Sequence, residues 1–146
     1  MTANSTGKAF ELKCIELIKQ HRSFVNTSAR IHWSNTNFYR PDAITETELF
    51  EFKYQQVAGS VRNKLTQAVL ELQWMSENTN QQAVLVYEGK EIESFINKDP
   101  AFKMSLNIAP SVKLLHIHSL YDYLTASVDS NNRDSDRLLE YSTACA

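Results

Sequence analysis

Apolar positions recur every three or four residues in two long stretches of the chain, which is the spacing of an amphipathic helix. The first predicted helix runs from Gly7 to about His21 and the second from about Val61 to Ser76. Two shorter helices are predicted over Lys90–Ile96 and Leu120–Ala126. The stripe of the second helix that we expect to be buried consists of Leu65, Val69, Leu72 and either Met75 or Trp74.

Runs rich in β-branched and aromatic residues predict the strands. In the run Glu48–Tyr54, side-chain alternation places Phe50 and Phe52 on one face and Glu51 and Lys53 on the other. A polar loop is predicted over residues 34–37, and another loop passes through the prolines between residues 97 and 111. The predicted strands cover residues 24–33, 42–45, 48–54, 83–87 and 112–117.

This order of elements predicts an α/β sandwich with a mixed central sheet flanked by helices. The length of 146 residues suits one domain with one hydrophobic core. We expect that domain to span residues 1–126 and a polar, flexible tail to span residues 127–146. Cys14 lies among apolar residues and is predicted to be core, and a packing role is favoured for His32 and Trp33.

Composition is that of an ordinary soluble protein, with 42% hydrophobic and 22% charged residues. No apolar run approaches the roughly 18 residues that span a bilayer, and the start lacks the layout of a signal peptide. We therefore expect a cytoplasmic protein without a membrane partner. The net charge of −2 divides unevenly, as +3 over residues 1–64 and −5 over residues 65–146. Bulk charge alone favours no partner.

The candidate chemistry lies in the basic half. Asp42 and Glu51 fall on adjacent predicted strands, where their carboxylates would converge on one hard cation such as Mg²⁺. The backbone carbonyl of Phe52 is a further candidate ligand, and Glu11 on the first helix is a third carboxylate. Lys53 projects to the same side as Glu51, where it would orient an attacking water or stabilise phosphoryl charge.

Each residue also has a simpler interpretation. Asp42 follows Pro41 as a turn acceptor would, and Glu51 with Lys53 matches a solvent-facing pair on an amphipathic strand. Glu11 alone matches a first-turn acid favoured by the helix dipole. Their joint arrangement favours the metal site.

Pro41-Asp42 followed by Glu51-Phe52-Lys53 resembles the PD-(D/E)xK motif of the restriction-endonuclease-like nucleases. Glu11 resembles the helical glutamate that many members place before the first strand. The resemblance implies a three-layer fold with an αβββαβ core and a catalytic set of Glu11, Asp42, Glu51 and Lys53. It also implies Mg²⁺, with Mn²⁺ as a substitute, held by the three carboxylates and the Phe52 carbonyl. The residues that we expect to contact nucleic acid are Lys8, Arg40, Arg62, Lys64 and Gln67.

The resemblance implies an endonuclease, with DNA preferred over RNA, of the compact homing or restriction type or a junction resolvase. Cleavage of both strands of a duplex by one site per chain implies a homodimer. Target recognition would come from loops such as residues 34–40 and 88–111. Two alternatives stay open: a tRNA-cleaving toxin of the same fold with an inhibitor protein as partner, and a non-catalytic nucleic-acid-binding module.

Overall fold

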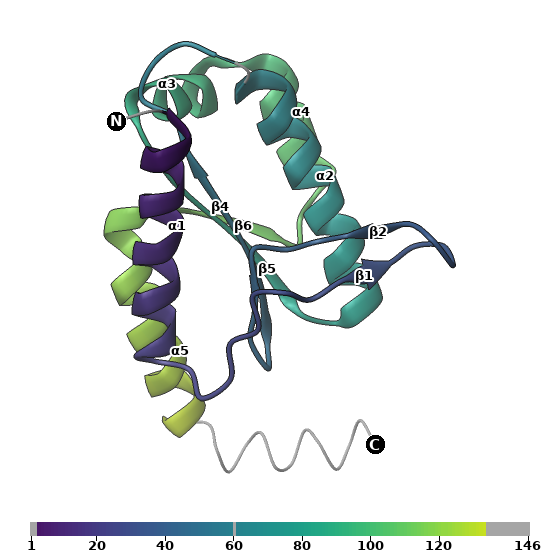
Figure 1. The fold of residues 1–146 in the computed structure, drawn as a ribbon, viewed down its shortest axis with the longest axis vertical. Coiled ribbons are helices and arrows are strands. Elements are labelled where there is room, and N and C mark those ends of the chain that lie inside the picture. The colour runs from purple at the N-terminus through teal and green to yellow at the C-terminus, as the bar shows by residue number, and fades with distance from the viewer. Residues whose placement is uncertain (1–2, 60, 134–146) are drawn as a thin grey trace.

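The computed structural model describes the backbone of residues 3–59 and 61–133 and the side chains of residues 6–59 and 64–126. Four consecutive strands follow the first helix, and from there on helices separate the strands (Figure 1). In order, they are α1 (Ala3–Lys19), β1 (Ile31–His32), β2 (Phe38–Tyr39), β3 (Ala43–Ile44), β4 (Glu48–Tyr54), α2 (Val61–Thr79), β5 (Gln82–Glu88), α3 (Lys90–Lys98), α4 (Pro100–Asn107), β6 (Val112–His116), the 3₁₀ turn η1 (Ile117–Ser119) and α5 (Leu120–Arg133).

The central sheet has the strand order β3-β4-β5-β6. β3 pairs antiparallel with β4, whereas β4, β5 and β6 are parallel. This mixed sheet confirms the predicted α/β class. β1 and β2 form a separate antiparallel hairpin, and a bridge between Asn26 and Ile44 joins the chain before it to β3. In the described part of the chain, no helix is both long and apolar enough to span a membrane.

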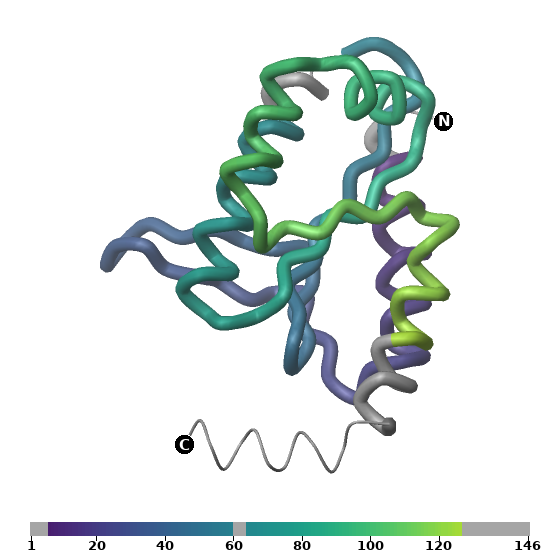
Figure 2. Tube along the Cα trace, turned by 180° about the vertical axis from the view of Figure 1, so that it is seen from behind, coloured from purple at the N-terminus to yellow at the C-terminus, as the bar shows by residue number. Residues whose placement is uncertain are grey.

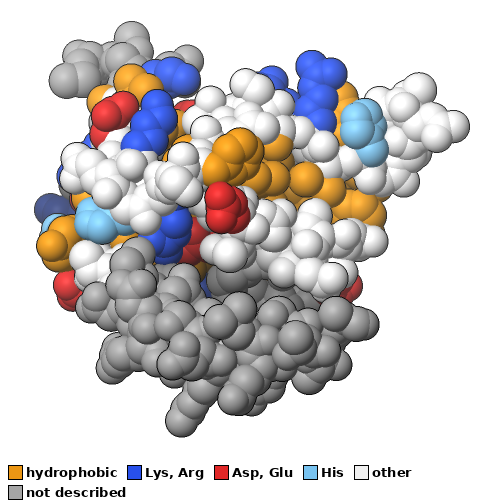
Figure 3. All heavy atoms as spheres, turned by 90° about the horizontal axis from the view of Figure 1, so that it is seen from below, with side chains coloured by type: hydrophobic (Ala, Val, Ile, Leu, Met, Phe, Trp, Pro, Cys, Tyr) orange, Lys and Arg blue, Asp and Glu red, His pale blue; other side chains and the backbone are white. Residues whose placement is uncertain are grey.

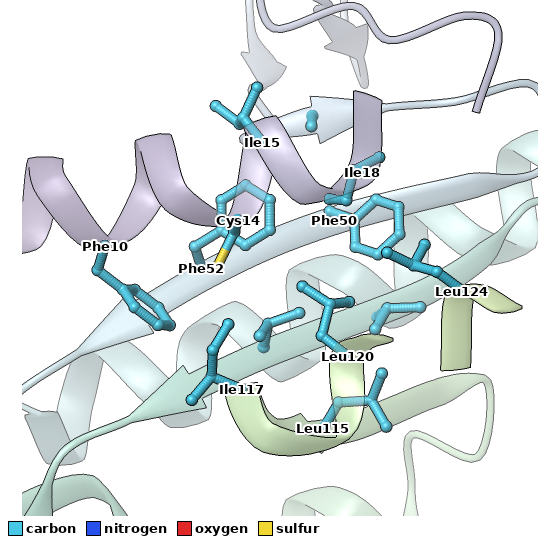
Figure 4. Close-up of a cluster of buried hydrophobic side chains, with 13 residues drawn as sticks. Phe10, Cys14, Ile15, Ile18, Phe50, Phe52, Leu115, Ile117, Leu120 and Leu124 are labelled. Carbon is cyan, nitrogen blue, oxygen red and sulfur yellow. The ribbon is translucent and has the colours of Figure 1, made fainter. Parts of the chain in front are cut away.

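Helices cover both faces of the sheet (Figures 1 and 2). On one face, α1 and α5 pack against the sheet, and Phe10, Cys14 and Ile18 of α1 meet Phe50 and Phe52 of β4 (Figure 4). The apolar residues of α1 recur at i, i+4 and i+8, so they form a single buried stripe. The Cys14 side chain is fully buried, which confirms the core prediction.

The other face is covered by α2, α3 and α4. Leu65, Val69 and Leu72 of α2 pack with Leu49 of β4 in the second core cluster. Met75 is 3% exposed and is the last member of this stripe, in preference to Trp74. The predicted stripe is therefore confirmed. β5 is almost continuously apolar because it is an inner strand whose two faces are both covered.

The predicted strand over residues 24–33 is wrong. Only the Asn26 bridge and the two residues of β1 pair within that range. The Asn26 side chain accepts a hydrogen bond from the Ser28 backbone N–H at 2.8 Å, a local turn that leads the chain away from the sheet. The packing role expected for His32 and Trp33 holds only in part. Both side chains are exposed, Trp33 at 51%, but the His32 ring lies 5.3 Å from the Phe38 ring and the Trp33 ring 6.2 Å from the Tyr39 ring.

Two predictions about the second half of the chain need correction. The loop predicted over residues 97–111 contains α4, whose start is capped by Asp99 accepting from the Phe102 N–H at 2.9 Å, with Pro100 at the first position. The closing helix, predicted to end at Ala126, continues to Arg133. The rest of the predicted tail, residues 134–146, lies outside the described residues.

A buried polar network holds together the segment that follows α1, helix α5 and the turn between β3 and β4. Arg22 donates to both oxygens of Glu48, at 2.8 Å and 2.9 Å. Tyr123 Oη and Thr45 Oγ1 donate to the same carboxylate at 2.7 Å and 2.8 Å. The side chain of Glu48 is 2% exposed and that of Arg22 is 11% exposed, so this ion pair is shielded from solvent.

Candidate active site

The position of Asp42 follows from the shortness of β3. The Asp42 N–H donates to the Phe50 carbonyl at 2.9 Å, and the Asp42 Oδ2 accepts from the Phe52 N–H at 2.7 Å. The carboxylate thus takes the place that a longer β3 would have filled with a backbone carbonyl. Because the N–H and C=O of a strand residue point to the same side, the Phe52 carbonyl faces this edge as well.

Glu51 and Lys53 lie on the face of β4 opposite Phe50 and Phe52, as the alternation predicts. The two phenylalanines are buried against α1 (Figure 4), whereas Glu51 and Lys53 stay partly accessible at 17% and 28%. The Lys53 Nζ lies 3.1 Å from the Glu51 Oε2. The carboxylate and the ammonium group are therefore paired on one surface.

Asp42 and Glu51 are close enough to perturb each other strongly. Burial, and then the charge of Asp42, raises the pKa of Glu51 from 4.5 to about 7, although Lys53 opposes the change. Burial also raises the pKa of Asp42, while its bond from the Phe52 N–H opposes the rise. Each acid thus lies where the charged form of the other is unfavourable, and the Phe52 N–H and the Lys53 ammonium group are the contacts that oppose this effect.

Glu11 contributes charge but is not part of a common ligand set. It belongs to α1, which covers the Phe50 and Phe52 face, whereas Glu51 points to the other face. Its charge raises the pKa of Asp42, and its Oε1 lies 4.0 Å from the Nζ of Lys8. Among the described side chains, no three His, Cys, Asp or Glu residues lie close enough together to hold a metal ion. The predicted set of three carboxylates is therefore not assembled; the pair of Asp42 and Glu51 is.

The residues predicted to contact nucleic acid are spread over two regions. Lys8 and Arg40 are exposed, and Arg40 precedes Asp42 by two residues. Lys64 and Gln67 are exposed on α2, where Gln67 Nε2 donates to the Glu71 side chain at 2.9 Å. The side chain of Arg62 lies outside those described.

A group of three residues beside Lys53 was not predicted from the sequence: Tyr87, His116 and Glu93. The strand register places Lys53 opposite Tyr87 and Tyr87 opposite His116, and His116 Nε2 lies 2.9 Å from Glu93 Oε1. His116 Nδ1 accepts from the His118 N–H at 3.2 Å, so both ring nitrogens are engaged and Nε2 carries the proton. This group could have been expected from one general rule, which is that the carboxyl ends of parallel strands meet at one edge of a sheet.

Comparison of the chain with family models, curated proteins and solved structures finds no match. The α/β architecture with a mixed four-stranded sheet and flanking helices is observed directly. The restriction-endonuclease-like fold and the nuclease activity rest on the motif residues and stay predictions.

Proposed function

We propose that this protein is a metal-dependent phosphodiester hydrolase that acts on nucleic acid, with DNA as the preferred substrate. The observation that supports this most is the grouping of Asp42, held by the Phe52 N–H at 2.7 Å, with Glu51, whose carboxylate lies 3.1 Å from the Lys53 ammonium group. The charge of Asp42 contributes to the raised pKa of Glu51, so the two acids are unfavourable together as anions, and a bound divalent cation removes that repulsion.

The chemistry of the donors fits a hard cation. Asp42, Glu51 and the Phe52 carbonyl supply oxygen atoms at one edge of the sheet, and Mg²⁺ sites commonly use one or two carboxylates plus water and substrate phosphate. When bound, such an ion lowers the pKa of a water and stabilises charge on the attacking and leaving oxygens. Glu11 adds negative charge near Asp42, which raises the affinity of the edge for a cation.

The protein groups then have separate tasks. The Phe52 N–H fixes the orientation of the Asp42 carboxylate through the 2.7 Å hydrogen bond. Lys53 is held by Glu51 at 3.1 Å, and from this position it orients a water or stabilises the charge of the phosphoryl group. Tyr87 and His116 extend the same row of the sheet beyond Lys53.

A cleavage assay with supercoiled plasmid and tRNA, in Mg²⁺ and in Mn²⁺, tests the proposal. We expect the wild-type protein to cut plasmid DNA. We expect Asp42→Asn, Glu51→Gln and Lys53→Met each to lose about a hundredfold or more in rate, with substrate binding retained. Glu46→Gln, which alters an exposed acid in the turn before β4, is the matched control and should cut normally.

The outcomes separate the alternatives. Cleavage of tRNA alone would identify an RNase, and no cleavage of either substrate at high protein concentration would indicate a non-catalytic binding module. Normal cleavage by Asp42→Asn would refute the assignment of the site.

A further inference from the structure

Residues 27–40 form an arm that projects away from the sheet, with β1 and β2 as its two strands (Figure 1). Its tip is a compact turn. The Trp33 N–H donates to the Asn37 carbonyl at 3.0 Å, and the Ser34 Oγ accepts from the Asn37 N–H at 2.9 Å and from the Asn37 Nδ2 at 3.1 Å. These bonds define one conformation for the turn.

A series of aromatic contacts anchors the arm to α2. The rings of Trp33 and Tyr39 are 6.2 Å apart, and those of Tyr39 and Trp74 are 5.7 Å apart in an edge-on arrangement. Ile31 and Tyr39 also pack against the core cluster beneath α2. The arm returns to the sheet at Pro41, so it is fixed relative to Asp42.

The arm is basic and aromatic, whereas the whole chain is acidic. No Asp or Glu occurs between Glu16 and Asp42, and the arm carries Arg30, His32 and Arg40, all exposed. The Arg30 guanidinium lies 4.6 Å from the centre of the Phe38 ring. Among the described side chains, neither arginine forms an ion pair with an acid.

The surface view agrees with this distribution. Figure 3 shows basic and histidine side chains side by side near the projecting lobe on the right of the molecule. Within the arm, Trp33 is 51% exposed, although its size makes burial favourable. Uncompensated cations are groups that bind phosphates, and an exposed ring can make apolar contacts with thymine methyl groups in the major groove.

We propose that the arm inserts into the major groove of duplex DNA and places the backbone phosphates at the edge formed by Asp42, Glu51 and Lys53. This inference rests on the proposed function, because it assigns a substrate class to the same site. A two-stranded ribbon with a strand spacing of about 4.8 Å fits the B-DNA groove, which is about 12 Å wide. The major groove of A-form RNA is too narrow and deep for it, so the arm selects DNA over duplex RNA.

Equilibrium binding to labelled duplexes tests the proposal. All measurements use the full chain carrying Asp42→Asn, in Mg²⁺, with duplex DNA, duplex RNA and single-stranded DNA of one sequence. The arm variants are Arg30→Gln combined with Arg40→Gln, and Trp33→Ala. The matched controls are Lys98→Gln combined with Lys103→Gln, which removes two exposed cations elsewhere, and Tyr121→Ala, which removes a ring that is 55% exposed on α5.

We expect duplex DNA to bind more tightly than duplex RNA or single strands. The double arginine variant should lose about tenfold or more in affinity for duplex DNA, and its slope of log K against log salt should fall by about 2, since each phosphate contact contributes about 0.9. Trp33→Ala should weaken binding with little change in this slope. The controls should bind like the parent.

Equal binding by the arm variants and the parent would overturn the proposal, as would equal affinity for DNA and RNA duplexes. The binding assay does not depend on hydrolysis, so the two proposals fail separately. Arm-dependent binding without cleavage by the wild-type protein would support the arm and refute the nuclease. Cleavage without arm-dependent binding would refute the arm alone.

Discussion

Replacement of Glu51 by Gln is expected to stabilise the metal-free protein at pH 8 and not at pH 4.5. Gln has nearly the shape of the protonated acid but never ionises. The pKa of Glu51 rises from 4.5 to about 7 because the acid is buried beside Asp42. A carboxyl whose pKa is raised on folding adds stability below the unfolded pKa, and this stability is lost as the pH rises through the folded pKa.

The size of the effect follows from that change in pKa. Each unit corresponds to about 1.4 kcal/mol, so the wild-type protein loses about 3 kcal/mol relative to Glu51→Gln between pH 4.5 and pH 8. The side chain is 17% exposed, so solvent screens this energy only in part. A difference of this size corresponds to about 10 °C in melting temperature for a chain of this length.

Urea unfolding followed by tryptophan fluorescence, in EDTA at both pH values, measures this difference. Glu46→Gln is the control, because an exposed acid should give a small and nearly constant difference between the two pH values. A stability difference for Glu51→Gln that stays the same from pH 4.5 to pH 8 would refute the raised pKa of Glu51. Added Mg²⁺ should raise the stability of the wild-type protein at pH 8 more than that of Glu51→Gln.

Two further pairs of substitutions test the packing of the fold. Burial opposes ionisation of Glu48, but hydrogen bonds from Arg22, Tyr123 and Thr45 hold its pKa below the ordinary 4.5, so its contribution is present above that pH and lost as the pH falls through the folded pKa. Arg22→Met should therefore cost about 3–5 kcal/mol in urea unfolding at pH 7, whereas Lys19→Met at an exposed pair should cost under about 1 kcal/mol; equal losses would contradict the buried-pair argument. Gly89→Ala should cost about 2 kcal/mol or more by the same measurement, because Gly89 has φ 120° and an added Cβ would meet the Gln55 backbone. Gly7→Ala in α1, where a Cβ meets nothing within 4 Å, should instead stabilise by about 0.5–1 kcal/mol, and the opposite signs are the check.

The features that could be predicted from the sequence are those that depend on local periodicity. Alternation in β4 placed Glu51 and Lys53 together because Phe50 and Phe52 had to face a core. The contact of Asp42 with the Phe52 N–H was not predictable, because it depends on where β3 ends and on its register with β4. The alignment of Tyr87 with its neighbours depends likewise on the register of parallel strands, which no local pattern contains.

The strand prediction for residues 24–33 was wrong for a different reason. Residues 24–33 have the composition of a strand, and composition does not reveal whether a partner strand is present. The turn at Asn26 and the anchoring of Tyr39 on Trp74 decide the path of the chain instead. Because α2 supplies that anchor from far along the sequence, only the tertiary structure shows that the aromatic residues form an arm.

The bridge between Asn26 and Ile44 makes the arm a separable module. Its two backbone hydrogen bonds, both 2.8 Å, hold the chain just before the arm beside β3, the strand that follows the arm. The cost of closing a loop grows only slowly with its length, so residues 34–37, beyond the aromatic anchors, can lengthen or change sequence with little effect on the sheet. The proposed recognition and the proposed hydrolysis would therefore change independently, since the first depends on a surface hairpin and the second on the strands beneath it.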